Sequence, residues 1–398
     1  MVCDHSTVRI AFVIPYFYPA LGYGGKPRLA YEMGRALSLR GHEITVLATD
    51  TGGPARIPPE TIRQIQSNGL HGMHVHFYRN LSNQFAYRHR VFLSTAYFRD
   101  VRRRLAESDV VHIHDFRSFM SVGASRTALS LRKPFVLSPH GGLQHLGKKS
   151  AKLVFDLLWG NKILRNAAAL CAVSPLEEHD AAAFGVERQR IHSLPPPIDT
   201  EQYKHLPQRG TFAAQWSLQN RKMILFLGRL HWLKGADILI EALSRLPELS
   251  ALHLVIAGSD DGAERQLKER VQLKGLGERV TFTGFLDDRQ KLNALVDSDV
   301  VVIPSRREGF PLTVLEAMAC ETPVILTSAC DLGHWITPQR GLTTFRTEDP
   351  ADLAEKIKTA LCVRGERNMM GEARSFVLSE FSLDAIASRA EQLYRSLI

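Results

Sequence analysis

The sequence alternates short, almost wholly apolar runs with longer segments that carry apolar residues at helical spacing. Apolar runs that end at Pro or Gly predict strands buried on both faces, as in parallel sheets. Such runs occupy residues 8–14, 43–48, 75–78, 110–114, 134–138, 168–173, 223–227, 252–257, 280–283, 300–303 and 323–327. Between them, helices are predicted most clearly at 27–40, 88–107, 236–246, 312–320, 350–362, 366–378 and 384–397, and a surface loop at 51–70.

This β/α pattern runs twice along the chain, and three consecutive prolines separate the two series. Pro195, Pro196 and Pro197 stiffen the backbone and cannot continue a sheet, so they mark a domain boundary. Strands that alternate with helices predict a parallel sheet with helices on both faces. The sequence therefore predicts an α/β protein with two doubly wound, Rossmann-like domains, 1–195 and 196–383, and a ligand cleft between them.

Two acidic residues follow the predicted strand 300–303. Glu308 begins the turn Glu-Gly-Phe-Pro, and Glu316 lies in the helix that starts near Leu312. Open α/β sheets bind ligands at the carboxyl ends of their strands, and carboxylates accept hydrogen bonds from sugar or ribose hydroxyls. The pair therefore predicts a site for a polyhydroxylated ligand. The alternative is a solvated turn acid and a helix acid favoured by the helix dipole.

Two cations lie in the loop between the predicted strand 223–227 and the helix that follows it. Arg229 and Lys234 are five residues apart, beside the amino end of that helix. An Arg that can bind two oxygens at once and a Lys that acts as a point charge together suit a diphosphate. A pair of solvated loop cations is the alternative interpretation.

A glycine-rich loop and a histidine follow two strands of the first half in the same way. Gly24 and Gly25 precede the first predicted helix and would let a phosphate or sugar approach its amino end, although such a loop is often only a turn. His140 stands where a strand opens into a Gly-Gly loop, which favours a role in a site. His112 and His114 alternate on one strand and are predicted to be packed residues.

The composition is that of an ordinary globular protein, with 44% hydrophobic and 23% charged residues. The sequence contains no apolar run of about 18 residues and no signal-peptide pattern at its N-terminus. Its five cysteines are scattered, without CxxC spacing. We therefore expect a cytoplasmic protein with reduced thiols, without a disulfide framework, a zinc site or a transmembrane helix.

The positive net charge of +9 belongs entirely to the first half. Residues 1–200 carry a net +10, whereas residues 201–398 carry −1. A basic half indicates an anionic substrate, an anionic membrane surface or nucleic acid as partner, unless the basic face has no specific partner. The segment 148–165 is basic, aromatic and amphipathic, and is either a membrane-surface helix or an ordinary domain helix.

These motifs together resemble a known family. Gly228-Arg229 with Lys234-Gly235, followed by Glu308-Gly-Phe-Pro-Leu-Thr-Val-Leu-Glu316-Ala, is similar to the retaining GT-B glycosyltransferases of family 4. The Gly-Gly loop, the His140-Gly loop and the terminal helix resemble the same family. The sequence departs from it after the strand 323–327, where Ala-Cys-Asp-Leu-Gly-His replaces the segment that many relatives carry, so no residue role is transferred there.

The resemblance implies a GT-B fold in which a nucleoside-diphosphate sugar binds the second domain and a hydroxyl acceptor binds the first. Arg229 and Lys234 would hold the diphosphate, Glu316 the ribose and Glu308 the transferred sugar, while His140 would contact the donor sugar from the acceptor side. The expected donor-binding set also contains Gly24, Gly25, Gly228, Gly284, Phe285, Gly309, Phe310, Pro311 and Leu312. The family usually needs neither metal nor cofactor, and its last helix, 384–398 here, returns to the first domain.

The expected activity is therefore sugar transfer with retention, in polysaccharide or glycolipid biosynthesis. The donor would be linked to UDP or GDP, and the acceptor would be a glycan, a glycolipid or a small molecule, with anionic and lipid-linked acceptors included. Peripheral contact with the inner face of the cell membrane would suit the basic half. The alternatives are another GT-B-type enzyme, such as a nucleotide-sugar epimerase or a phosphorylase, and a non-catalytic nucleotide-sugar-binding protein. A nucleic-acid binder is disfavoured, because no DNA- or RNA-binding module is recognisable.

Overall fold

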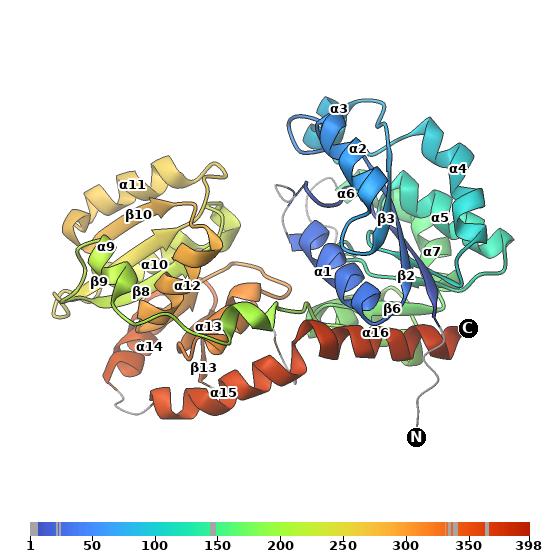
Figure 1. Ribbon diagram of the computed structural model, residues 1–398. Coiled ribbons are helices and arrows are strands. Elements are labelled where there is room, and N and C mark those ends of the chain that lie inside the picture. The colour runs from blue at the N-terminus through green and yellow to red at the C-terminus, as the bar shows by residue number, and fades with distance from the viewer. Residues whose placement is uncertain are drawn as a thin grey trace, which may run out of the picture. The chain divides into compact units, whose positions relative to one another are not determined.

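The computed structural model describes residues 7–20, 23, 25–143, 149–330, 332, 336, 341–362 and 366–398 (Figure 1). The chain forms two compact units. The first contains residues 1–197 together with 383–398, and the second contains residues 198–382. The division predicted at 195/196 lies two residues away from this one.

The first unit is built on a seven-stranded sheet in which every strand pair is parallel. The order is β3-β2-β1-β4-β5-β6-β7, and the register pairs Ile10 with Ile44 and with Val110. The strands are short and mostly buried on both faces, as the apolar runs predict. They are β1 (Arg9–Val13), β2 (Glu43–Thr49), β3 (Met73–Tyr78), β4 (Val110–Ile113), β5 (Phe135–Leu137), β6 (Ala169–Ala172) and β7 (Ile191–Ser193).

Helices cover both faces of this sheet (Figure 1). On one face, α1 (Gly25–Leu39), α2 (Pro59–Asn68) and α16 (Leu383–Leu397) pack on β1 and β2. On the other face lie α4 (Thr95–Ala106), α5 (Phe119–Ser130), α7 (Asn161–Asn166) and α8 (Pro175–Ala183). The remaining elements are α3 (Asn83–His89), α6 (Lys149–Phe155), η2 (Asp156–Gly160) and η3 (Arg188–Arg190).

The second unit repeats this architecture with a six-stranded parallel sheet of order β10-β9-β8-β11-β12-β13. Its strands are β8 (Lys222–Leu227), β9 (Leu252–Ala257), β10 (Val280–Gly284), β11 (Val300–Ile303), β12 (Val324–Thr327) and β13 (Leu342–Phe345). The prediction of two doubly wound parallel sheets is therefore confirmed. The strand β13 was not predicted, because Leu-Thr-Thr-Phe is too polar for the buried-strand pattern.

Two sets of helices cover this second sheet, and each belongs to a separate apolar core. One face carries α10 (Ala236–Ser244), α11 (Glu264–Leu273) and α14 (Pro350–Cys362). The other carries α9 (Thr211–Gln215), α12 (Asp288–Asp297), α13 (Leu312–Ala319) and α15 (Glu366–Glu380). Single turns complete the unit at η4 (Thr200–Tyr203), η5 (Trp232–Lys234) and η6 (Gly277–Arg279).

Two local predictions are wrong. The expected surface loop 51–70 contains α2, which starts at Pro59, where proline's missing N–H costs nothing, and buries Ile65. The expected helix 88–107 is two helices, because Arg90 adopts the left-handed conformation that ends α3. Ser94 then caps α4 by accepting a hydrogen bond from the Tyr97 N–H. In the first case a proline at the helix start, and in the second a left-handed helix end followed by a serine cap, outweighs the broader polar or basic pattern.

The terminal helix α16 belongs to the first unit and is joined to it by polar contacts, of which the one to His112 is buried. Tyr394 lies within 2.6 Å of His112 Nδ1 on β4. Arg40, just beyond α1, donates to Asp384 at 2.5 Å and to Glu391 at 2.9 Å. No described helix is long and apolar enough to cross a membrane.

Candidate functional site

In the second unit, the strand order reverses between the neighbouring strands β8 and β11. Ligands of open α/β sheets bind beside the loops that follow such strands, at the carboxyl edge of the sheet. The two loops touch. Gly235 has a φ of +70°, and a Cβ at this position would lie 2.0 Å from the Pro304 carbonyl oxygen. The Arg306 N–H also donates to the Leu233 carbonyl at 2.9 Å. Glycine at 235 therefore brings the cationic loop against the acidic loop.

Lys234 and Glu308 meet at this junction. The Lys234 ammonium donates a hydrogen bond to Glu308 Oε2, and the Ser305 hydroxyl donates to the same oxygen at 3.3 Å. Both charged side chains are partly buried. The contact places a cation beside a carboxylate that can accept hydrogen bonds, at the edge where open α/β sheets bind ligands, although 74 residues separate the two in sequence.

Arg229 takes a different partner, which the sequence analysis missed. Its guanidinium pairs with Asp261 in the loop after β9, and its side chain is 55% exposed. The absence of a side chain at Gly258 lets this loop approach the loop after β8. A Cβ at this position would lie 1.9 Å from the Gly228 carbonyl oxygen. Since an exposed ion pair is worth about 0–1 kcal/mol, Arg229 can exchange Asp261 for an anionic ligand at little cost.

Glu316 forms a separate pair, also unpredicted, with Lys291. The Lys291 ammonium donates to Glu316 Oε1 at 2.8 Å, and both side chains are only 11% exposed. The pair joins α13 to α12 across the face that these helices cover. The structure therefore gives the two predicted acids different surroundings, with Glu308, in the loop after β11, paired to Lys234 and Glu316, on α13, paired to Lys291.

The other predicted donor residues of the second unit lie at the ends of strands or helices. Gly228 follows β8 and donates its N–H to Ala257 O at 3.0 Å. Gly284 ends β10 and accepts from the Gly258 N–H at 2.8 Å, and the next residue, Phe285, is exposed. The run Gly309-Phe310-Pro311 leads into α13, whose first residue is Leu312. The Val314 N–H donates to Pro311 O at 3.0 Å, and the amides of Leu312 and Thr313 before it have no partner four residues back within α13, so these two are suited to an anion.

In the first unit, His140 lies in the loop after β5, three residues beyond Leu137, and its ring contacts another histidine. It has a φ of +50°, and its Nε2 lies 3.2 Å from His114 Nδ1. Burial, with the charge of Lys26 adding to it, lowers the pKa of His140 well below its usual value. The imidazole is therefore neutral near pH 7 and suits a hydroxyl better than a phosphate.

The histidines on β4 form a stack behind His140. The rings of His112 and His114 lie 3.9 Å apart, and those of His114 and His140 lie 5.4 Å apart. His112 also contacts Ser138 Oγ at 2.7 Å, and burial lowers its pKa to about 3. The prediction that His112 and His114 are packed residues is confirmed, and through His114 this packing supports His140.

At the strand reversal of the first unit, between β1 and β4, an ion pair joins the start of α1 to the loop after β4. Lys26 donates to Asp115 at 2.6 Å, and both side chains are largely buried. Gly25 begins α1 beside it, and Gly24 lies outside the described residues. Asp115 was missed, although its place directly after an apolar strand is the same signal that identified His140.

Glu177 fixes the loop that carries His140. Its two carboxylate oxygens accept hydrogen bonds from the Gly141 N–H at 2.5 Å and the Val173 N–H at 3.0 Å. Burial nevertheless raises the pKa of Glu177 to about 7. Nothing in the sequence singles out this residue, because Ser-Pro-Leu-Glu is also a common helix start, and Ser174 does cap α8.

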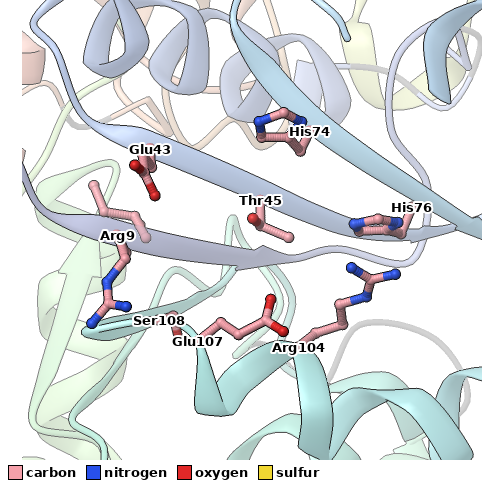
Figure 2. Close-up of a pocket in the computed structure, with 9 residues that line it drawn as sticks. Arg9, Glu43, Thr45, His74, His76, Arg104, Glu107 and Ser108 are labelled. Carbon is pink, nitrogen blue, oxygen red and sulfur yellow. The ribbon is translucent and has the colours of Figure 1, made fainter. Parts of the chain in front are cut away.

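A cavity of about 360 Å³ lies elsewhere in the first unit, at the amino ends of β1, β2 and β3 (Figure 2). Figure 2 shows Arg9, Thr45 and His76 around it, with Arg104 reaching in from α4. This edge is opposite to the one where α/β sheets bind ligands, and none of the predicted site residues lines the cavity. Among the described residues, no group of three or more His, Cys, Asp or Glu side chains is arranged to hold a metal ion.

Two family models match the two halves of the chain. Glycosyltransferase Family 4 matches residues 23–202, and Glycosyl transferases group 1 matches residues 209–375. An uncharacterized glycosyltransferase of Methanocaldococcus jannaschii is 26% identical over 407 residues, covering 98% of this chain and 98% of the relative. The D-inositol 3-phosphate glycosyltransferase of Xylanimonas cellulosilytica is 25% identical over 398 residues, covering 93% and 91%.

Among solved structures, HepE of Anabaena in complex with UDP has the same fold. Its TM-score is 0.80, with 19% identity over 98% of this chain and 100% of HepE. The same protein in complex with UDP-glucose gives a TM-score of 0.76. At this identity the likeness is one of fold, and it extends over both units.

Proposed function

Since this chain belongs to the GT-B glycosyltransferases, with one half in Glycosyltransferase Family 4 and the other in Glycosyl transferases group 1, we propose that it transfers a sugar from a nucleoside-diphosphate sugar to an acceptor hydroxyl with retention. The observation that carries the proposal is the contact between Lys234 and Glu308 at the strand reversal of the second sheet. It supplies a cation for phosphate and a carboxylate for sugar hydroxyls at one point.

In this proposal Lys234 and Arg229 bind the donor diphosphate, after exchanging Glu308 and Asp261 for its oxygens. Glu308, once released, accepts hydrogen bonds from the transferred sugar, and Glu316 accepts them from the ribose. The amides at the start of α13 add donors for the phosphates. Lys234, Arg229 and these amides supply the positive charge that a divalent metal ion provides in other nucleotide enzymes. We therefore propose that the reaction needs neither a metal nor a cofactor.

The proposed transfer takes place on one face of the sugar. The bond from the anomeric carbon to the diphosphate oxygen breaks, and a bond from the same carbon to the acceptor oxygen forms on the same side. The acceptor proton passes to the departing diphosphate oxygen. Lys234 and Arg229 stabilise the negative charge that develops there, and such preorganised charge is usually the largest contribution to catalysis.

The first unit would bind the acceptor. Neutral His140 offers a hydrogen bond to a hydroxyl, and the net charge of +10 on residues 1–200 favours an anionic acceptor. The D-inositol 3-phosphate glycosyltransferase named above, with which this chain shares 25% identity, is named for a phosphorylated substrate. Small anionic polyols and lipid-linked phosphates are therefore the acceptors to test first.

A nucleotide screen followed by a transfer assay tests this function. We expect UDP, GDP or ADP, and the corresponding nucleotide sugar, to raise the unfolding temperature, because a ligand at 100 times its Kd adds about 2.7 kcal/mol. UDP-glucose is the first donor to try. The product should be a glycoside with the anomeric configuration of the donor. A free epimer or a sugar phosphate as the product, or binding without turnover, would contradict the proposal.

We also propose that the first unit contacts the inner face of the cell membrane. The helical run α6–η2 exposes Leu153, Val154, Leu157 and Leu158, and Leu157 is 78% exposed. Their spacing places them on one side of the run. Exposed Lys162 and the neighbouring Arg165 continue the same region on α7. An apolar ridge beside basic side chains is complementary to an anionic lipid surface.

Replacing both Leu157 and Leu158 by Asp should weaken binding to vesicles that contain phosphatidylglycerol by about tenfold or more, because each buried leucine contributes about 1.5–3 kcal/mol. Leu273→Asp is the matched control, since Leu273 is 86% exposed on α11 of the second unit. Vesicle flotation measures the binding. Equal binding of the double variant and the control, or equal binding to uncharged vesicles, would refute the contact.

A further inference from the structure

Arg306 lies two residues before Glu308, and its side chain holds several groups outside its own loop. Its guanidinium donates to both carboxylate oxygens of Asp237, each at 2.8 Å, and to the Trp232 carbonyl at 2.6 Å. Its Nε donates to Glu348 at 2.9 Å. The side chain is only 18% exposed. One side chain therefore links the loop after β11 to the loop after β8 and to α10.

These contacts enclose the stretch of backbone that carries Lys234. The carbonyl of Trp232 accepts from the Arg306 side chain, and the carbonyl of Leu233 accepts from the Arg306 N–H at 2.9 Å. On the other side of Lys234, Asp237 lies in the first turn of α10 and accepts the two-fold hydrogen bond. Arg306 therefore binds residues on both sides of Lys234 in the chain, while the Lys234 ammonium contacts Glu308.

The Arg306–Asp237 pair remains charged at any ordinary pH. The hydrogen bonds to Asp237 raise the pKa of Arg306 further, against the effect of burial. Burial by itself would raise the pKa of Asp237, but the hydrogen bonds and charge of Arg306 hold it below its usual value. The guanidinium also lies 5.5 Å from the centre of the Trp232 ring. A lysine has neither the fork nor the planar face for these contacts.

The adjacent Arg307 differs in every respect. Its side chain is exposed, and among the described residues no ion pair or hydrogen bond of this side chain is found. The two arginines of Ser305-Arg-Arg-Glu308 are indistinguishable in sequence. Only one of them faces the loop that carries Lys234, so the other provides a natural control.

We infer that Arg306 is a positioning residue of the phosphate site, which together with Asp237 sets the place of Lys234 relative to Glu308. The inference rests on the function proposed above. Arg306 itself does not touch the donor. Its loss displaces the ammonium from the diphosphate and leaves the proposed ribose contact of Glu316 in place. Diphosphate affinity and turnover should therefore fall, whereas nucleoside affinity should not.

The test compares Arg306→Lys and Asp237→Asn with Arg307→Ala, using whichever of UDP, GDP and ADP binds most tightly and the corresponding nucleoside. Calorimetry should show a loss of about tenfold for the diphosphate in both variants, the value of one charge-assisted hydrogen bond, and less than about twofold for the nucleoside. The double variant should be no worse than either single one, because both break the same contact. Arg307→Ala should bind both ligands normally.

Equal losses for the diphosphate and the nucleoside would show a general disruption of the unit and overturn the inference. So would wild-type diphosphate affinity in both variants. Lys234→Ala, measured in parallel, separates this outcome from failure of the proposed function. If Lys234→Ala weakens diphosphate binding and the Arg306 and Asp237 variants do not, the positioning role alone is wrong. If Lys234→Ala has no effect, the phosphate site itself is wrong.

Discussion

Replacing Lys234 by Ala should lower the rate of sugar transfer about 10²–10³-fold, the usual cost of removing one preorganised donor from a developing negative charge. The contact seen in the structure adds to this effect. Without the ammonium, the Glu308 carboxylate loses its ion-pair partner and faces the incoming diphosphate as a like charge. Both the donor affinity and the turnover should therefore fall, measured as KM and kcat with labelled donor.

Lys222→Ala is the matched control for this variant. Lys222 begins β8, at the opposite edge of the same sheet, and its side chain is exposed. Its ammonium makes a long contact of 4.0 Å with Asp299. Its removal takes away one positive charge without touching the loop at the strand reversal. Arg229→Ala should also be impaired, since its exchange of Asp261 for phosphate is part of the proposal. Turnover of Lys234→Ala at the level of Lys222→Ala would exclude the phosphate assignment.

Replacing Glu316 by Ala should have two effects of different origin. Loss of a charged acceptor for the ribose should weaken nucleotide binding by about 10- to 100-fold. Loss of Glu316 leaves the exposed Asp288, at 3.3 Å, as the remaining ion-pair partner of the Lys291 ammonium among the described residues, which should lower the free energy of unfolding by about 1–3 kcal/mol. Urea unfolding and calorimetry with the nucleoside diphosphate measure the two effects separately.

A double variant distinguishes the functional effect from the structural one. Changing Glu316 and Lys291 together to Met removes both charges, and apolar replacement of a buried pair is often neutral for stability. The double variant should regain most of its stability and remain defective in nucleotide binding. Recovery of nucleotide affinity along with stability would mean that Glu316 only stabilises the packing of α12 against α13 and does not bind the ribose.

The residues of the candidate site that can be found from the sequence share one property: they stand directly after an apolar strand or at the start of the next helix. Lys234, Glu308 and His140 all meet this description, because parallel sheets bind ligands at that edge. Asp115 meets it too and was overlooked. Asp261 and Glu177 also lie in a loop after a strand or at a helix start, and Lys291 lies within a helix, but none of the three is distinguished from its neighbours in sequence, because each becomes relevant only through a partner on another element.

By itself the sequence determined the two doubly wound units, the boundary near the three prolines and the strand ends that carry the candidate chemistry. These features follow from local periodicity and from proline, so short windows contain them. The tertiary structure alone decided which charges meet: Lys234 with Glu308, Glu316 with Lys291, and Arg306 but not Arg307 with Asp237. These partners lie 74, 25 and 69 residues apart; close packing at Gly235 brings the first and third pairs together, and the packing of α12 beside α13 brings the second together.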